Sequence, residues 1–211
     1  MRRYHWLDIT VFVLLLASIC HSQSFFIGGG LSVASDNDNT DGGIGFNAFF
    51  GYELPGRALV KGSIGRYTSD TKMDLMEGDY SLLWLEGSYL RTLGGSFLRM
   101  GPEPKIKPYG GAGGGYYLFE HEISSNMKTL LSQVGIEWNE EIQNTFGVHI
   151  RGGLDIELSP TIMINVDLKY NYLKPKVDIK TMELETDILE TFEEEIDLST
   201  MIISVGLKVS I

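Results

Sequence analysis

The chain has 211 residues and a net charge of −11, with 43% hydrophobic, 21% charged and 11% aromatic residues and 25 glycines. This length suits one domain, and the composition lacks the bias of disordered or collagen-like chains. The acidity disfavours a nucleic-acid partner. Much of it comes from the stretch ELETDILETFEEEID, which runs from Glu183 to Asp197.

The N-terminal segment has the pattern of a secretory signal peptide. Two arginines precede the apolar run ITVFVLLLASIC, and small polar residues follow it. The run is shorter than the roughly 20 apolar residues that a transmembrane helix needs. We therefore expect residues 1–22 to be an export signal, cleaved after Ser22, and residues 23–211 to form the exported domain. A lipoprotein signal at Cys20 is the alternative, although Ile19 stands where that pattern prefers a small residue.

Period-two alternation predicts eight strands in the exported domain, and no segment longer than about ten residues has a strong helical period. The first four strands are expected at 25–35, 43–54, 57–67 and 80–92. The polar loop DNDNTDGG follows the first strand, and the tight turn LPGR follows the second. The polar loop lacks the glycine and glutamate spacing of a calcium-binding loop, so we expect no metal site in it.

The second half of the domain carries the other four predicted strands. The fifth strand, KIKPYGGAGGGYYLF, is so rich in glycine that parity does not indicate its facing. In the long segment 120–145 that follows, SNMKTLLSQ predicts one or two helical turns. The sixth and seventh strands, 146–158 and 161–172, form a hairpin around the sequence SP. An acidic loop, 173–198, leads to the eighth strand at 201–211.

Each sorted strand places apolar side chains on one parity and polar or small ones on the other, because successive side chains point to opposite sides. In the seventh strand Val166 has the apolar parity, and Asp167 and Lys169 have the polar parity. In a soluble eight-stranded carrier of lipocalin type, the apolar parity would line the interior. In a membrane barrel it would face lipid instead.

Three features favour the membrane barrel. Along the chain the connections are long, short, long, intermediate, long, short and long, which gathers the long loops at one end. The polar parity is rich in Gly and Ser, as a narrow lumen requires. The aromatic residues also bunch at strand ends, where an interfacial girdle would lie: Phe50 with Tyr52, Tyr116 with Tyr117, and Tyr170 with Tyr172. We therefore predict an all-β fold, an eight-stranded antiparallel up-and-down transmembrane β-barrel, with both termini periplasmic and long extracellular loops.

Several segments together resemble the small OmpW-like outer-membrane barrels, with OmpX and the OmpA barrel as cousins. These are the signal peptide, the eight strands, KPYGGAGGGYY in the fifth strand and the hairpin FGVHIRGGLDIELSPTIMINVDLKYNY. The resemblance covers essentially the whole exported domain. It implies a place in the outer membrane of a Gram-negative-type bacterium, contact with its lipid and lipopolysaccharide, and recognition of the last strand by the assembly machinery. The family usually ends in an aromatic residue, whereas this chain has Ile211. We expect a monomer.

The inward parity carries ionisable residues that we predict to form a charge network in the lumen: Lys61, Glu86, His149, Arg151, Asp155, Asp167, Lys169 and Lys208. The interior of an eight-stranded barrel is just wide enough for side chains, so opposite charges can pair there. Some eight-stranded barrels modify lipids, but no motif ties a serine or an acid to His149. We therefore expect no catalytic residue, no bound metal and no cofactor.

Two functions remain open at this point. The charged inward face favours a structural or surface-interaction protein with a filled lumen and long extracellular loops. The alternative is a narrow channel or binding barrel for small solutes, because OmpW is described as having a hydrophobic lumen and is thought to bind or pass small apolar molecules. The acidic loop 173–198 could bind divalent cations that bridge lipopolysaccharide, or it could be a charged loop with no specific ligand.

Overall fold

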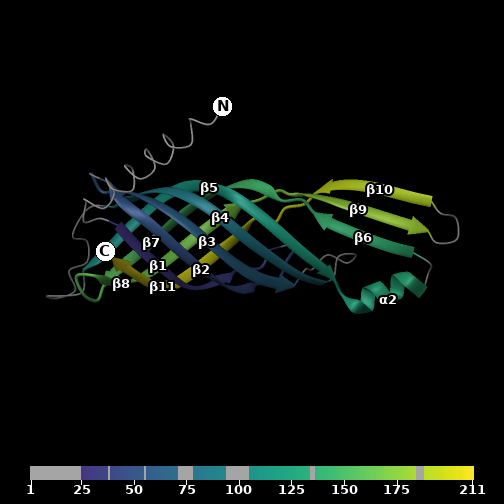
Figure 1. The fold of residues 1–211 in the computed structure, drawn as a ribbon, viewed down its shortest axis with the longest axis horizontal. Helices are drawn as coiled ribbons and strands as arrows, with labels where there is room; N and C mark the ends of the chain where they lie inside the picture. The colour runs from purple at the N-terminus through teal and green to yellow at the C-terminus, as the bar shows by residue number, and fades with distance from the viewer. Residues whose placement is uncertain are drawn as a thin grey trace, which may run out of the picture.

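The computed structural model describes residues 25–37, 39–54, 56–70, 78–93, 105–133, 136–183 and 188–211. Eight antiparallel strands close a barrel in the order β1-β11-β8-β7-β5-β4-β3-β2 (Figure 1). They are β1 (Phe25–Ala34), β2 (Gly43–Leu54), β3 (Ala58–Asp70), β4 (Gly78–Thr92), β5 (Ile106–Ile123), β7 (Thr145–Glu157), β8 (Ile162–Tyr172) and β11 (Thr200–Ser210). The predicted eight-stranded antiparallel barrel is confirmed. The export signal expected at residues 1–22 lies outside the described residues.

The barrel closes where its first strand pairs with its last. The β1–β11 register runs from Phe26 opposite Ser210 to Ala34 opposite Ile202. Beyond the ladder, the Ile211 amide donates a hydrogen bond of 2.9 Å to the Phe25 carbonyl. Each barrel strand therefore has two neighbours and no free edge, which is the condition for β structure inside hydrocarbon.

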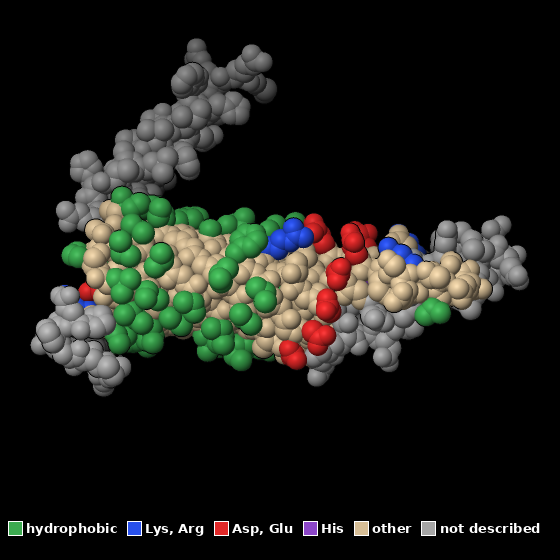
Figure 2. Space-filling model, turned by 90° about the horizontal axis from the view of Figure 1, so that it is seen from below, with side chains coloured by type: hydrophobic (Ala, Val, Ile, Leu, Met, Phe, Trp, Pro, Cys, Tyr) green, Lys and Arg blue, Asp and Glu red, His purple; other side chains and the backbone are tan. Residues whose placement is uncertain are grey.

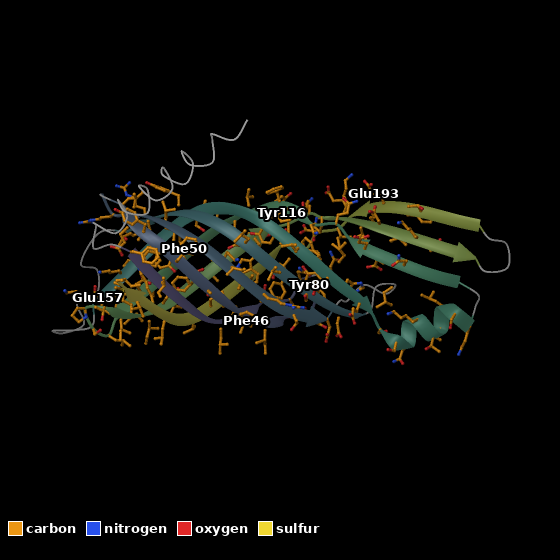
Figure 3. All side chains as sticks on the ribbon, viewed as in Figure 1. Phe46, Phe50, Tyr80, Tyr116, Glu157 and Glu193 are labelled. Atoms are coloured by element: carbon orange, nitrogen blue, oxygen red, sulfur yellow. The ribbon has the colours of Figure 1, made fainter. Side chains whose placement is uncertain are left out.

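The outer wall carries the apolar parity of each strand. Leu31 is 71% exposed, Phe46 62% and Val148 60%, while the inward Asp167 and Lys169 are 3% and 2% exposed. Apolar side chains cover the barrel in Figure 2, and a row of Asp and Glu lies beyond them; Figure 3 shows Phe46 pointing away from the barrel. This facing is the reverse of a soluble carrier and matches a wall that contacts lipid.

The inner wall contains aromatic rings as well as charges, and glycines on neighbouring strands make room for them. A Cβ atom on Gly51 would collide with the ring of Phe26, and one on Gly65 would collide with the ring of Trp84. The prediction that Tyr117 belongs to an outer aromatic girdle is wrong, since its side chain is fully buried inside the barrel. The neighbouring Tyr116 does face outward, against the ring of Phe146.

Two barrel strands are much longer than a membrane requires. β5 has 18 residues, and at ~3.3 Å per residue and a tilt of about 40° it rises about 45 Å, against an apolar band about 25 Å tall. The far ends of β4 and β5 therefore rise beyond the apolar belt. There the outward side chains are polar, including those of Asp79, Glu120 and Glu122.

A second sheet, here called the distal sheet, lies past the barrel end opposite Ile211 (Figure 1). It has the order β10-β9-β6 and consists of β6 (Ile136–Ile142), β9 (Lys176–Glu183) and β10 (Ile188–Glu195), with the helix α2 (Ser125–Gln133) beside it. No helix among the described residues is long and apolar enough to cross a membrane.

The expectation of loops without strands at 120–145 and 173–198 is therefore wrong, although the short helix was anticipated. The acidic run was expected to be a charged loop, but it forms part of a sheet, and strand alternation divides its carboxylates between two faces. Pairing also brings lysines beside them, because Lys176 forms an ion pair with Glu193.

An apolar cluster joins the distal sheet to the barrel. It includes Trp84 and Tyr117 from the lumen and Ile142 and Val177 from the distal sheet, all of them buried. A buried contact between His121 of β5 and Glu140 of β6, with 3.2 Å between Nδ1 and Oε1, lies at the same junction. Packed side chains that belong to both sheets therefore lie at this mouth of the barrel.

The facing of the wall predicts how arginine substitutions should act. Val166→Arg, near the middle of β8 on the outer face, should lower the free energy of unfolding by about 2–4 kcal/mol, because arginine has no partner in hydrocarbon. Thr68→Arg, on the outer face of β3 beyond the belt, is the matched control and should change little. Urea titration of the refolded protein in lipid vesicles measures both. Equal stability of Val166→Arg and wild type would show that this face does not meet lipid.

Candidate functional site

The eight residues predicted to form a lumen network all lie on the inner wall, and none is more than 8% exposed. They come from five strands, β3, β4, β7, β8 and β11, which barrel closure brings around one interior. The contacts among them form two groups. One is centred on the carboxylates of Glu86 and Asp167, and the other on the carboxylate of Asp155.

Glu86 accepts hydrogen bonds at both carboxylate oxygens. Lys169 Nζ donates to Oε1 at 2.6 Å, and the Tyr117 hydroxyl donates to the same oxygen at 2.8 Å. The Ser63 hydroxyl donates to Oε2 at 3.1 Å, and Arg151 Nη2 lies 3.8 Å from that oxygen. A buried carboxylate with several donors and two cations around it has the partners that its charge requires.

Asp167 has a similar set of partners on the other side of the same arginine. The Tyr109 hydroxyl donates to Oδ2 at 2.6 Å, and Lys61 Nζ donates to Oδ2 at 3.2 Å. Arg151 Nε lies 3.3 Å from Oδ1. Arg151 therefore lies between the two carboxylates and connects the partners of Glu86 with those of Asp167.

The second group lies where β7, β8 and β11 meet. Lys208 Nζ donates to Asp155 Oδ2 at 2.7 Å, and Asn165 Nδ2 donates to Asp155 Oδ1 at 2.7 Å. Lys208 is also 3.6 Å from Glu53 of β2, which the sequence prediction left out of the network although it shares the inward parity. With Glu53 included, four cationic side chains face four carboxylates: Lys61, Arg151, Lys169 and Lys208 against Glu53, Glu86, Asp155 and Asp167.

Aromatic rings cover the ammonium groups of the three lumen lysines. The distances from Nζ to the ring centroid are 4.2 Å for Lys61 over Phe49, 4.4 Å for Lys169 over Trp84 and 4.1 Å for Lys208 over Phe26. A ring face attracts a cation, and more strongly where water is absent. The sequence analysis did not place these rings in the lumen, although their inward parity could have indicated it.

His149 shares a hydrogen bond with Ser88, although no sequence motif relates the two residues. Ser88 Oγ and His149 Nε2 share a hydrogen bond of 2.8 Å across Gly113, which lies opposite both residues and has no side chain to separate them. His149 Nδ1 is 3.8 Å from Glu86 Oε1, beyond hydrogen-bond distance, and Arg151 Nη1 donates to Ser88 Oγ at 3.2 Å. Ser88, His149 and Glu86 follow one another as in a Ser-His-acid catalytic triad. No hydrogen bond from Glu86 orients the imidazole, however, and the hydroxyl oxygen of Ser88 already accepts a hydrogen bond from Arg151.

Little space remains around these groups. The cavity beside Lys61, Arg151 and Lys169 has a volume of about 10 Å³, and a second beside Asp155 and Lys208 is equally small. Each has room for at most about one water molecule. Within the described residues, no cluster of three or more His, Cys, Asp or Glu is arranged to hold a metal ion.

Buried apolar side chains lie on both sides of the network. Along β4, inward positions run from Leu90 in one apolar cluster, through Ser88 and Glu86, to Trp84 and Leu82 in the other. The first cluster comprises Phe26, Phe49, Leu59, Leu90 and Tyr109. The charges are thus held in a layer between two apolar layers.

A closed antiparallel barrel with an apolar outer belt and a filled polar interior defines a membrane β-barrel of the outer-membrane type. A family model described as the outer membrane protein beta-barrel domain matches residues 11–210, and the chain belongs to this family. Its place is therefore the outer membrane. The predicted resemblance to small outer-membrane barrels is confirmed.

Solved structures with the same fold include OprG from Pseudomonas aeruginosa, with 18% sequence identity and a TM-score of 0.68 over 89% of this chain and 95% of that one. Neisserial surface protein A has 13% identity and a TM-score of 0.54, covering 90% and 98%. The N-terminal barrel of Pseudomonas aeruginosa OprF has 12% identity and a TM-score of 0.50, covering 90% and 98%. A search of curated proteins gave no match. At these identities the likeness is one of fold alone.

The position of Arg151 between two carboxylates predicts a large effect of its removal. Arg151→Ala should lower the free energy of unfolding by about 3–5 kcal/mol, because Glu86 and Asp167 lose a cation where no water can replace it. Arg66→Ala is the control, since the Arg66–Glu120 pair is exposed and should contribute only about 0–1 kcal/mol. Denaturant titration in vesicles compares the two.

Exchanging the charges of Asp155 and Lys208 tests whether direct pairing of these two side chains stabilises the barrel. Asp155→Lys and Lys208→Asp should each destabilise the barrel, and the double variant should recover part of the loss. Recovery stays partial because Glu53 would then face an aspartate. A double variant no more stable than the worse single variant would contradict direct pairing.

Proposed function

We propose that this outer-membrane β-barrel protein has a closed lumen and acts outside the membrane, through the parts of the chain that extend beyond the barrel. The filling of the lumen carries the proposal. Paired ions occupy its middle, apolar clusters lie on either side, and the cavities among the ions are about 10 Å³ each. A hydrated solute has no room in such an interior.

The extracellular end of the barrel, in this proposal, is the one that carries α2 and the distal sheet. The two longest connections, from β5 to β7 and from β8 to β11, lie there, and the short connection 158–161 lies at the other end with Phe25 and Ile211. Outer-membrane barrels have short turns on the periplasmic side. Both termini are accordingly periplasmic, and residues 1–22 direct export.

The proposed role is structural or interactive and involves no catalysis. Ser88 and His149 are the nearest approach to a catalytic arrangement among the described residues, but both are buried within the ion network. Their hydrogen bond satisfies polar groups that the barrel interior encloses, as buried polar groups require.

Electrical recording tests the closed lumen. The purified wild-type protein should give little or no steady conductance in planar bilayers, with a general porin in the same membrane as the positive control. Two results together would contradict the closed lumen: steady conductance of the wild-type protein, and an Arg151→Ala variant with changed ion selectivity but unchanged stability. The protein would then be a narrow channel for small solutes.

Surface labelling tests the orientation. An epitope tag inserted after Lys128 in α2 should bind antibody on intact cells. A tag inserted after Ser159, in the turn between β7 and β8, should bind antibody only after the outer membrane is permeabilised. Labelling of the Ser159 tag on intact cells would reverse the proposed orientation.

A further inference from the structure

The strand β10 forms a margin of the distal sheet. One side of β10 pairs with β9 from Ile188 opposite Glu183 to Glu195 opposite Lys176. On its other side no strand of the described part of the chain is paired with it, and Figure 1 shows β10 at the outer margin of the sheet. Such a margin presents main-chain groups that a further strand can bind.

Hydrogen bonds just past β10 indicate which residues turn toward that margin. The amides of Ile196 and Leu198 donate to the carbonyls of Pro175 and Leu173, on the side of β9. In an antiparallel pair, alternate residues bond to the partner and those between them point away from it. The amide and carbonyl groups of Thr191, Glu193 and Glu195 therefore face the free margin.

The same margin is strongly acidic. Residues 173–198 contain nine acidic and three basic residues, and Glu193, Glu194 and Glu195 are exposed. Figure 3 labels Glu193 on the outer part of the distal sheet. Lys176 and Lys174 pair with Glu193 and Glu195, but both lysines approach from the side of β9. The free side of β10 therefore keeps a negative potential.

The acidic side chains also determine which kind of strand can pair with the free margin of β10. If two copies of β10 paired along their margins, glutamates would stand opposite or beside glutamates, and like charges in facing positions are destabilising. A strand with lysine or arginine at alternate positions would meet opposite charges instead. Phe192 is 54% exposed and lies opposite Ile179 of β9, so an apolar residue of an added strand could pack beside it.

We propose that the free margin of β10 binds a basic, extended segment of a partner protein by adding it as a fourth strand to the distal sheet. Main-chain hydrogen bonds to Thr191, Glu193 and Glu195 supply the pairing, and the glutamates select for a cationic sequence. The proposal rests on the proposed function, because it requires the distal sheet to be outside the cell.

A peptide probe tests strand addition directly. The probe is a ten-residue peptide of alternating lysine and valine, and the receptor is the full-length barrel in nanodiscs of zwitterionic lipid, with empty nanodiscs as the blank. A second peptide of the same sequence, N-methylated at every amide, keeps the charge but has no N–H group on either edge and therefore cannot form the ladder. Calorimetry should give at least about tenfold weaker binding for the methylated peptide. Equal binding of the two peptides would overturn strand addition.

Variants of β10 locate the site. Thr191→Pro removes an amide that faces the margin and leaves the β9 ladder intact, so it should weaken binding of the unmethylated peptide about tenfold. Thr191→Ala keeps that amide and should bind like wild type. Glu193→Gln with Glu195→Gln should weaken binding and reduce its salt dependence.

Other outcomes decide against the proposal. Unchanged affinity in the Thr191→Pro variant, or a protein that dimerises through β10 in place of binding the peptide, would overturn it. Bilayer conductance and surface labelling test the proposed function by separate measurements, so a failure of strand addition would leave the closed lumen and the orientation standing.

Discussion

The structure depends on neutralising ionic side chains in a space that admits almost no water. Burying an unpaired charge costs several kcal/mol, so every lumen cation needs an anion within reach. The guanidinium of Arg151 lies beside two carboxylates, those of Glu86 and Asp167. Each lumen lysine has a carboxylate on one side of its ammonium group and an aromatic ring on the other. Glycines on adjacent strands provide the room for those rings. A lumen packed in this way resembles a protein core, and this packing supports the proposal that the protein binds its partners at the ends of the barrel.

Period-two alternation was enough to predict the barrel and the facing of most strands. The apolar parity of β8 and β11 is continuous along each strand, so a shift of one residue would expose every charge to lipid. That constraint placed Lys61, Glu86, Arg151 and Asp167 on one inward face without any knowledge of the register. Connection lengths predicted that the long loops would gather at one end, and the distal sheet forms from two of those segments.

Pairing between the adjacent strands β7 and β8, such as that of Arg151 with Asp167, follows from the hairpin. The pairs that cross the interior could not be predicted from the sequence, because they depend on closure. Lys61 and Asp167 are 106 residues apart and meet across the interior, and Ser88 reaches His149 only because Gly113 lies between them. Parity was uninformative in the glycine-rich β5, so the inward facing of Tyr117 was missed. The distal sheet was missed because a run of glutamates indicates repulsion until its lysine partners on β9 are known.

The seam between β1 and β11 has a consequence for assembly. The ladder that closes the barrel joins the two ends of the described chain, and Lys208 reaches Asp155 only once β11 is in place. Pairings between residues so distant in sequence form slowly, since the loop-closure entropy is lost before any contact is gained. Until the last strand arrives, the sheet has two unpaired edges and Asp155 lacks the ammonium group of Lys208, and neither is compatible with hydrocarbon. Insertion into the bilayer and closure of the seam must therefore occur as a single coupled event.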